Sequence, residues 1–161
     1  MKLLLSALLL MISSAVLAEI PTGTYKVDKI QCKTGYTMKL GGKFMEYAVY
    51  LDVKPTQMTM KVSAKSGSWA PFKLNCLQEN KGRIVYTAEN KYEGDLPMVN
   101  AKCNAETWTN IIKKKQFGVE AYGEFNYKVV GNKLTIWNPS TINKYKCTES
   151  GDYPIYYYTK Q

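Results

Sequence analysis

Apolar and polar residues alternate with a period of two along much of the chain that follows Thr22. Residues 45–53 carry apolar side chains at the odd positions, and residues 58–64 carry them at the even positions, with a proline-containing turn at 54–57. Such alternation is typical of an antiparallel strand with one buried face and one solvated face. The pattern therefore predicts a β-hairpin over residues 45–64.

The same alternation predicts further strands on both sides of this hairpin. The longest covers residues 117–129, where apolar side chains at odd positions oppose glutamate, asparagine and lysine at even positions. A turn at 131–132 follows this strand. Shorter alternating or tyrosine-rich runs lie at 72–76, 84–88, 99–105, 134–136 and 153–160.

The first strand, residues 25–32, contains a change of parity. Its apolar residues are Tyr25 and Val27 before the change and Ile30 and Cys32 after it. A β-bulge at 28–29 would absorb one extra residue and bend the strand. A bend of this kind allows a sheet to curl onto itself.

Together these segments make about nine short strands, joined mostly by tight turns, with no amphipathic helix expected after residue 18. Consecutive hairpins place sequence neighbours side by side, and an up-and-down sheet of this size tends to close and so remove its exposed edges. We therefore predict an all-β fold, a single up-and-down antiparallel β-barrel of about eight to nine strands. A two-sheet β-sandwich is the alternative.

The first 18 residues have the composition of a cleaved signal peptide. Lys2 supplies the positive charge, residues 3–17 are apolar apart from three serines, and Val16 and Ala18 precede the expected cleavage site. A membrane-spanning helix would need roughly 20 apolar residues, which is more than this run offers. We therefore predict a signal peptide at 1–18, one domain at 19–161, and a periplasmic or secreted location without a lipid anchor.

The chain is basic, with 22 lysines and arginines against 13 acidic residues and a net charge of +9. Arg83 is the only arginine. Base-specific contacts in nucleic-acid complexes are made largely by the forked guanidinium of arginine, so we expect no nucleic-acid partner. The excess of lysine favours an anionic membrane surface or an acidic envelope partner.

Four cysteines lie after residue 18, an even number that predicts two disulfides in an exported protein. The chain has no histidine and no CxxC motif, so we expect neither a metal site nor another cofactor. Three pairings are open. In an up-and-down barrel the last strand lies beside the first, which favours Cys32–Cys147 together with Cys76–Cys103.

The sequence does not favour an enzyme. Glu120 and Glu124 share one strand face, and paired carboxylates can carry out acid–base catalysis when one of them is buried. Their parity places them on the solvated face instead. No histidine is present to activate a serine or cysteine nucleophile.

Two short segments resemble the lipocalin-like, or calycin, β-barrels. Residues 23–25, Gly-Thr-Tyr, open the first strand where lipocalins have Gly-x-Trp, and residues 127–136 resemble a late hairpin of bacterial lipocalin-like domains. Tyr25 replaces the tryptophan, and Lys160 is the nearest basic candidate for the arginine that packs on that tryptophan. The resemblance implies a cup-shaped interior that holds a small apolar ligand.

We therefore predict a non-catalytic, exported binding protein for a small hydrophobic or amphipathic ligand. The alternative is an envelope or secreted protein-binding or inhibitor module that acts through its basic surface. An interior of several hundred Å³ would support the first function, whereas a filled core would move the function to the surface. The inward parity gives the candidate ligand-binding residues as Tyr47, Val49, Leu51, Met58, Met60, Leu74, Tyr86, Ala121, Phe125 and Tyr127.

Residues 108–117 combine apolar and basic side chains in what the pattern predicts to be a loop between two strands. Such a loop tip could contact an anionic membrane, with its apolar residues inserted and its lysines at the headgroups. An ordinary solvated hairpin end is the alternative. The candidate membrane-contact residues are Trp108, Ile111, Ile112, Lys113, Lys114 and Lys115.

Overall fold

The computed structural model describes residues 18–115, 122–140, 147, 149 and 151–161. Within them lie ten strands and one helix. The predicted signal peptide, residues 1–18, lies outside the described part except for Ala18 and stays a prediction. The elements are β1 (Gly23–Cys32), β2 (Thr37–Met38), β3 (Met45–Lys54), β4 (Gln57–Ser66), β5 (Asn75–Ala88), β6 (Lys91–Asp95), β7 (Met98–Cys103), α1 (Glu106–Lys115), β8 (Tyr122–Val130), β9 (Lys133–Trp137) and β10 (Pro154–Lys160).

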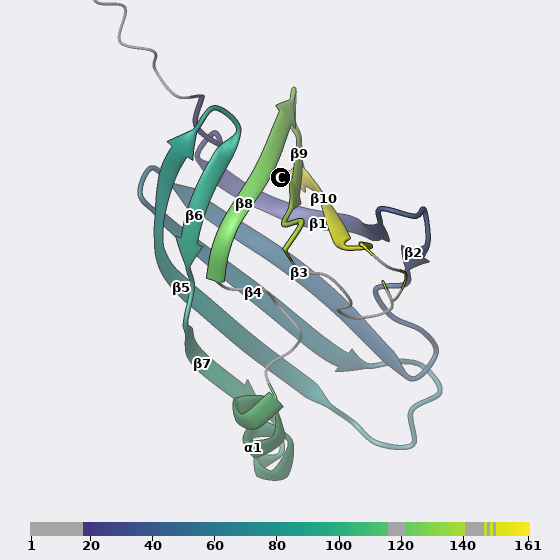
Figure 1. Ribbon diagram of the computed structural model, residues 1–161. Coiled ribbons are helices and arrows are strands. Elements are labelled where there is room, and N and C mark those ends of the chain that lie inside the picture. The colour runs from purple at the N-terminus through teal and green to yellow at the C-terminus, as the bar shows by residue number, and fades with distance from the viewer. Residues whose placement is uncertain (1–17, 116–121, 141–146, 148, 150) are drawn as a thin grey trace, which may run out of the picture.

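Eight strands form a closed antiparallel barrel, in the order β10-β9-β8-β6-β5-β4-β3-β1. The pairing of β1 with β10 closes the ring (Figure 1). The hairpin predicted over residues 45–64 is the β3–β4 pair, in which Met45 faces Ser66 and Lys54 faces Gln57. The predicted all-β barrel is confirmed, and the sandwich does not form.

The predicted irregularity in the first strand is also confirmed. The register of β1 against β10 shifts between Val27 and Lys29, so Asp28 is the extra residue. Asp28 accepts hydrogen bonds from Lys133 at 3.2 Å and from the hydroxyl of Thr159. The bulge lets Val27 and Ile30 face the same interior, although they have opposite parity.

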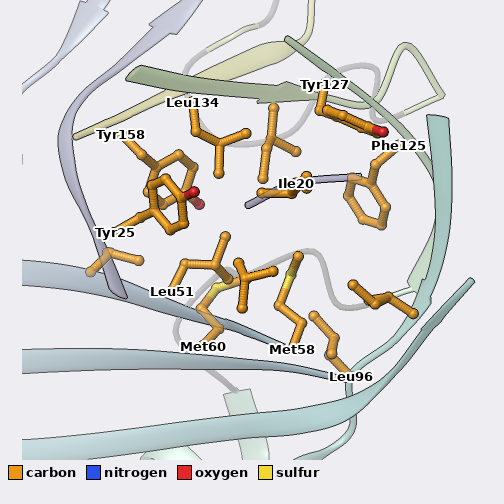
Figure 2. Close-up of a cluster of buried hydrophobic side chains, with 14 of the residues drawn as sticks. Ile20, Tyr25, Leu51, Met58, Met60, Leu96, Phe125, Tyr127, Leu134 and Tyr158 are labelled. Atoms are coloured by element: carbon orange, nitrogen blue, oxygen red, sulfur yellow. The ribbon is translucent and has the colours of Figure 1, made fainter. Parts of the chain in front are cut away.

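The main hydrophobic core fills the barrel, because alternate residues of every barrel strand point inward. Figure 2 shows these side chains converging from opposite walls. Tyr25, Leu51 and Leu134 are almost wholly inaccessible to solvent. The buried members of this cluster are Ile20, Tyr25, Val27, Val49, Leu51, Val53, Met58, Met60, Val62, Ile84, Tyr92, Leu96, Phe125, Tyr127, Leu134, Ile136 and Tyr158.

A second, smaller core lies where β7 pairs with the first half of β5, away from the pairing of β6 with the second half. Helix α1 packs on β7 and β5 at this end of the molecule (Figure 1). Its side chain Ile112 is buried there. The other buried members are Ala64, Leu74, Cys76, Ala101 and Cys103.

The prediction that the mature chain contains no helix is wrong. Residues predicted to form a loop, 108–115, belong to α1. Trp108, Ile111 and Ile112 have an i, i+3, i+4 spacing that is compatible with a helix, although only Ile112 is buried, and Glu106 in the first turn favourably meets the positive end of the helix dipole. The strand predicted from residue 117 is described only from Tyr122 onward.

Both disulfides join the predicted partners, Cys32 with Cys147 and Cys76 with Cys103. Cys76 and Cys103 lie directly opposite each other on β5 and β7. Cys147 ties the segment before β10 to the end of β1. Two disulfides indicate an oxidising environment outside the cytoplasm.

We predict that the two disulfides differ in their contribution to stability. The cysteines are 115 residues apart in the first and 27 in the second. The loss of loop-closure entropy in the unfolded chain therefore gives about 4.8 kcal/mol for Cys32–Cys147 and about 3.6 kcal/mol for Cys76–Cys103. Denaturant unfolding of the two double Cys→Ser variants measures this difference, and the opposite ranking would contradict it.

Candidate functional site

The interior of the barrel is the site that the sequence predicted for a ligand. Most of the ten predicted ligand-binding residues are buried: Val49, Leu51, Met58, Met60, Leu74, Phe125 and Tyr127. Tyr86 is half-buried beside the main core, whereas Leu74 belongs to the second core. Tyr47, near the start of β3, shares the parity of Val49 and Leu51 but is 37% exposed, so it does not belong to the buried core. Ala121 lies outside the described residues.

The main core encloses a cavity of about 20 Å³. This is close to the space that a single water molecule needs, about 10–15 Å³ or more. Binding sites for small molecules have volumes of roughly 300–1,000 Å³. The barrel is a fold compatible with ligand binding, but this cavity has no room for such a molecule. Its lining residues are Leu51, Met58, Met60, Tyr92, Leu96, Phe125, Ile136, Tyr156 and Tyr158.

Large aromatic rings account for the filled interior. The rings of Tyr92 and Phe125 stack at 5.1 Å, and Tyr127 lies 6.0 Å from Tyr92. Gly94 faces these rings, and a Cβ atom at its position would lie 3.3 Å from the Tyr92 ring. A larger residue there would crowd the stack, so Gly94 leaves the space that the rings occupy.

Five residues that line the cavity were missing from the predicted set: Tyr92, Leu96, Ile136, Tyr156 and Tyr158. Tyr92 lies directly opposite Tyr86 after the short turn that joins β5 to β6, so it faces the same side of the sheet as Tyr86 and Ile84. Ile136 of β9 lies directly opposite Tyr127 of β8, so its side chain also faces inward. Strand alternation could have found these two, whereas three successive tyrosines at 156–158 hide the alternation in β10.

The N-terminal segment closes one end of the barrel. Ile20 is only 3% exposed and lies among the core side chains in Figure 2. The Ile20 N–H donates to the hydroxyl of Tyr86 at 3.1 Å, and the Tyr25 hydroxyl donates to the Pro21 carbonyl at 2.6 Å. The Tyr127 hydroxyl donates to the carbonyl of Ala18. Tyr86 and Tyr25, from two different strands, thus hold Ile20 and Pro21 in place, whereas the Tyr127 bond is made to the last residue of the predicted signal peptide.

Burial alters the acidity of these tyrosines. It raises the pKa of Tyr86 to about 12 and the pKa of Tyr92 well above its usual value. Burial likewise raises the pKa of Tyr25 and of Tyr127. The cause is the same in each case, because a phenolate loses its hydration inside the barrel. All four hydroxyls therefore stay protonated at neutral pH.

The contact suggested by the lipocalin-like motif is present with changed residues. Tyr25 pairs with Lys160 across β1 and β10, and the ammonium of Lys160 lies 5.9 Å from the centre of the Tyr25 ring. The Lys160 side chain also crosses Gly23, where a Cβ atom would lie 2.5 Å from it. Gly23 thus leaves room for the end of the Lys160 side chain in its observed position.

The six predicted membrane-contact residues all lie on α1 and do not form one surface. Trp108 and Ile111 are exposed, as are Lys113 and Lys114. Ile112 points into the second core, so its assignment as a membrane contact is wrong. The predicted loop has a buried side because it is a helix. The side chain of Lys115 is outside the described part.

The carboxylates and cysteines that could carry out catalysis or bind a metal already contact other residues. Glu124 is exposed and pairs with Lys91 at 3.0 Å, while Glu120 lies outside the described residues. Cys32, Cys147 and Asp152 lie close together, but the two sulfurs form a disulfide and cannot act as thiolate ligands. The buried Asp152 carboxylate accepts hydrogen bonds from the backbone N–H and the hydroxyl of Thr34. This cluster fastens the loop before β10 to the end of β1.

No protein-family model, curated protein or solved structure matches the chain. Among the described residues, no helix is both long and apolar enough to cross a membrane.

We predict two classes of tyrosine in an alkaline titration. The folded-state pKa values of the interior tyrosines exceed the value of about 10 expected in the unfolded chain, so their contribution to stability is present below pH 10 and is lost as the pH rises towards about 12. Tyrosinate absorbance should therefore rise in two stages as the pH increases. Exposed tyrosines ionise in the first stage, and the interior tyrosines ionise in a second, sharper stage that coincides with the loss of the native circular dichroism signal.

One variant assigns the late rise. Tyr86→Phe should reduce only the late rise, because Tyr86 ionises with unfolding. Titration of all 13 tyrosines near pH 10 with native circular dichroism retained would contradict the buried assignment.

Proposed function

We propose that this protein is a non-catalytic binding protein that acts outside the cytoplasm and engages an anionic partner through its outer surface. The observation that carries the proposal is that the cavity among the described side chains of the main core has a volume of only about 20 Å³. The protein would then bind its partner on its outer surface. This is the alternative function that the sequence left open.

The charge of the exterior supports an anionic partner. The net charge is +9, and the outward faces of the barrel strands carry lysines at positions such as Lys26, Lys65, Lys81 and Lys128. In the described part of the chain, three lysines form ion pairs: Lys61 with Asp52, Lys91 with Glu124 and Lys133 with Asp28. With nine more basic than acidic residues, the surface keeps a positive excess after every internal pairing.

A non-catalytic role is supported by the side chains available. The chain has no histidine, and the exposed Glu124 is paired with Lys91 rather than placed in an apolar pocket. A carboxyl group needs such burial to serve as a general acid near neutral pH.

Carriage of a small apolar ligand is the second candidate. Met58 and Met60 line the cavity, and methionine side chains adapt readily to different shapes. Ile20 occupies the same interior from the N-terminal segment. A ligand of ordinary size would have to displace Ile20 and break its N–H bond to Tyr86.

Native mass spectrometry of protein purified from its own host separates these two functions. We predict that the native mass equals the mass of the denatured, oxidised chain, because the interior has no room for cargo. A stoichiometric small molecule that is present in the native spectrum and lost on denaturation would contradict the surface function and support carriage. An Ile20→Trp variant is the control, since a larger plug should abolish any carriage.

A further inference from the structure

Four exposed aromatic rings lie at one end of the molecule. Phe44, from the segment between β2 and β3, is 57% exposed. Trp69 and Phe72, between β4 and β5, are 61% and 44% exposed, and Trp108 of α1 is 40% exposed. We call these four residues the aromatic end. None of them is needed by the barrel interior, so their exposure calls for a separate explanation.

Specific contacts join the three chain segments that carry these rings. The Trp69 N–H donates to the Lys43 carbonyl at 2.8 Å, and the Gly67 N–H donates to the Phe44 carbonyl at 2.9 Å. Gly67 permits this approach, because a Cβ atom at its position would lie 2.4 Å from the Lys43 carbonyl oxygen. The rings of Phe72 and Trp108 stack at 6.3 Å with an interplanar angle of 24°. The aromatic end is thus a built surface.

The surroundings of the aromatic end are strongly basic. The segments 39–46, 65–74 and 102–114 contain seven lysines and two glutamates. The Lys43 ammonium lies 3.7 Å from the centre of the Trp69 ring, a cation–π distance. Lys73 is next to Phe72, and Lys113 and Lys114 follow Trp108 on α1. Lys43 therefore lies directly over one of the exposed rings, and the other lysines belong to the same chain segments as the rings.

The apolar area of this surface is substantial. A buried Phe or Trp side chain covers 150–250 Å², so four rings exposed by about one half present roughly 300–500 Å². The largest apolar patch on a monomeric protein is typically about 300–600 Å² and is often functional. A partner that meets only the charges would leave these rings in water.

The aromatic end lies opposite the end of the barrel that residues 18–21 close. The turns between β3 and β4, between β5 and β6 and between β8 and β9 lie beside those residues, whereas α1 and the segment before β5 lie at the far end (Figure 1). A flat partner can therefore meet the aromatic end without contacting the N-terminal segment.

We infer that the aromatic end docks the protein onto an anionic lipid bilayer. Tryptophan and phenylalanine rings partition to the level of the headgroups, and lysines beside them attract anionic phosphates. This inference rests on the proposed anionic partner and names it. Of the membrane contacts predicted from the sequence, the proposed docking surface retains Trp108 but not the buried Ile112. The proposed surface also includes Phe44, Trp69 and Phe72. A soluble anionic polymer would use the lysines but not the rings.

Vesicle flotation tests the rings. The full protein should bind vesicles of phosphatidylcholine mixed with phosphatidylglycerol at about 0.1 M salt and should dissociate at about 1 M salt. Phe44→Ser with Trp69→Ser should weaken binding roughly tenfold or more. The matched control is Val85→Ser with Val130→Ser, which removes two equally exposed apolar residues from barrel strands. Equal loss in both pairs would overturn the inference, and thermal melting checks that each variant is folded.

A second pair of variants tests the position of the charge. The first triple variant changes three lysines beside the aromatic end to Gln: Lys43, Lys73 and Lys113. The second triple variant changes three exposed lysines elsewhere on the barrel to Gln: Lys54, Lys81 and Lys128. Both triple variants have the same net charge, so the first should lose most of the vesicle binding and the second much less. Equal losses would mean that net charge alone drives binding, which also overturns docking by the aromatic end.

Tryptophan fluorescence separates this inference from the proposed function. Trp69 and Trp108 are two of three tryptophans, and Trp137→Phe leaves only those two. We expect a blue shift with anionic vesicles and none with soluble polyglutamate. Binding to polyglutamate but not to vesicles would overturn membrane docking and leave the proposed function standing. Binding to neither at low salt would overturn both.

Discussion

The pairing of β1 with β10 joins the two edges of one sheet, and the rest of the structure depends on it. Seven residue pairs connect the strands, from Tyr25–Lys160 to Cys32–Pro154. The bulge at Asp28 bends β1 so that this pairing can form, and the Cys32–Cys147 disulfide fastens the segment before β10 to the end of β1. Without closure both strands would expose unpaired backbone groups along their edges.

Closure with eight strands sets the width of the interior, which in a barrel of this size is either filled by side chains or just wide enough for one small ligand. Here the filling is done by large groups, among them Tyr25, Tyr92 and Phe125, and by Ile20 from the N-terminal segment. Little space is left between the described side chains of the core. We therefore propose that binding takes place at the loops and helix opposite the N-terminal segment, since such elements can vary without disturbing the core.

Local alternation was sufficient to predict the barrel. The hairpin over residues 45–64, the bulge at 28–29 and both disulfide partners are present in the structure as expected. Each follows from a period of two or from the neighbourhood of the first and last strands. Helix α1 was missed because its buried side consists mainly of Ile112, so its helical periodicity is carried by very few apolar residues.

The site was harder to predict than the fold, for two physical reasons. Parity shows which side chains point inward, but not whether their volumes fill the space between the walls. Tyr92 and Phe125 stack beside Gly94, where a Cβ atom would crowd the Tyr92 ring. The aromatic end is assembled from three segments far apart in the chain, so no local pattern could join Phe44 to Trp69.

The central claim is that the barrel is filled by its own side chains, so that binding takes place on its surface. A crystal structure of the protein purified from its host would test this claim most directly. We expect the Ile20 side chain inside the barrel, its N–H bonded to Tyr86, and an interior cavity with room for about one water molecule. An interior of several hundred Å³, with Ile20 withdrawn and continuous density for a bound molecule in its place, would contradict the claim.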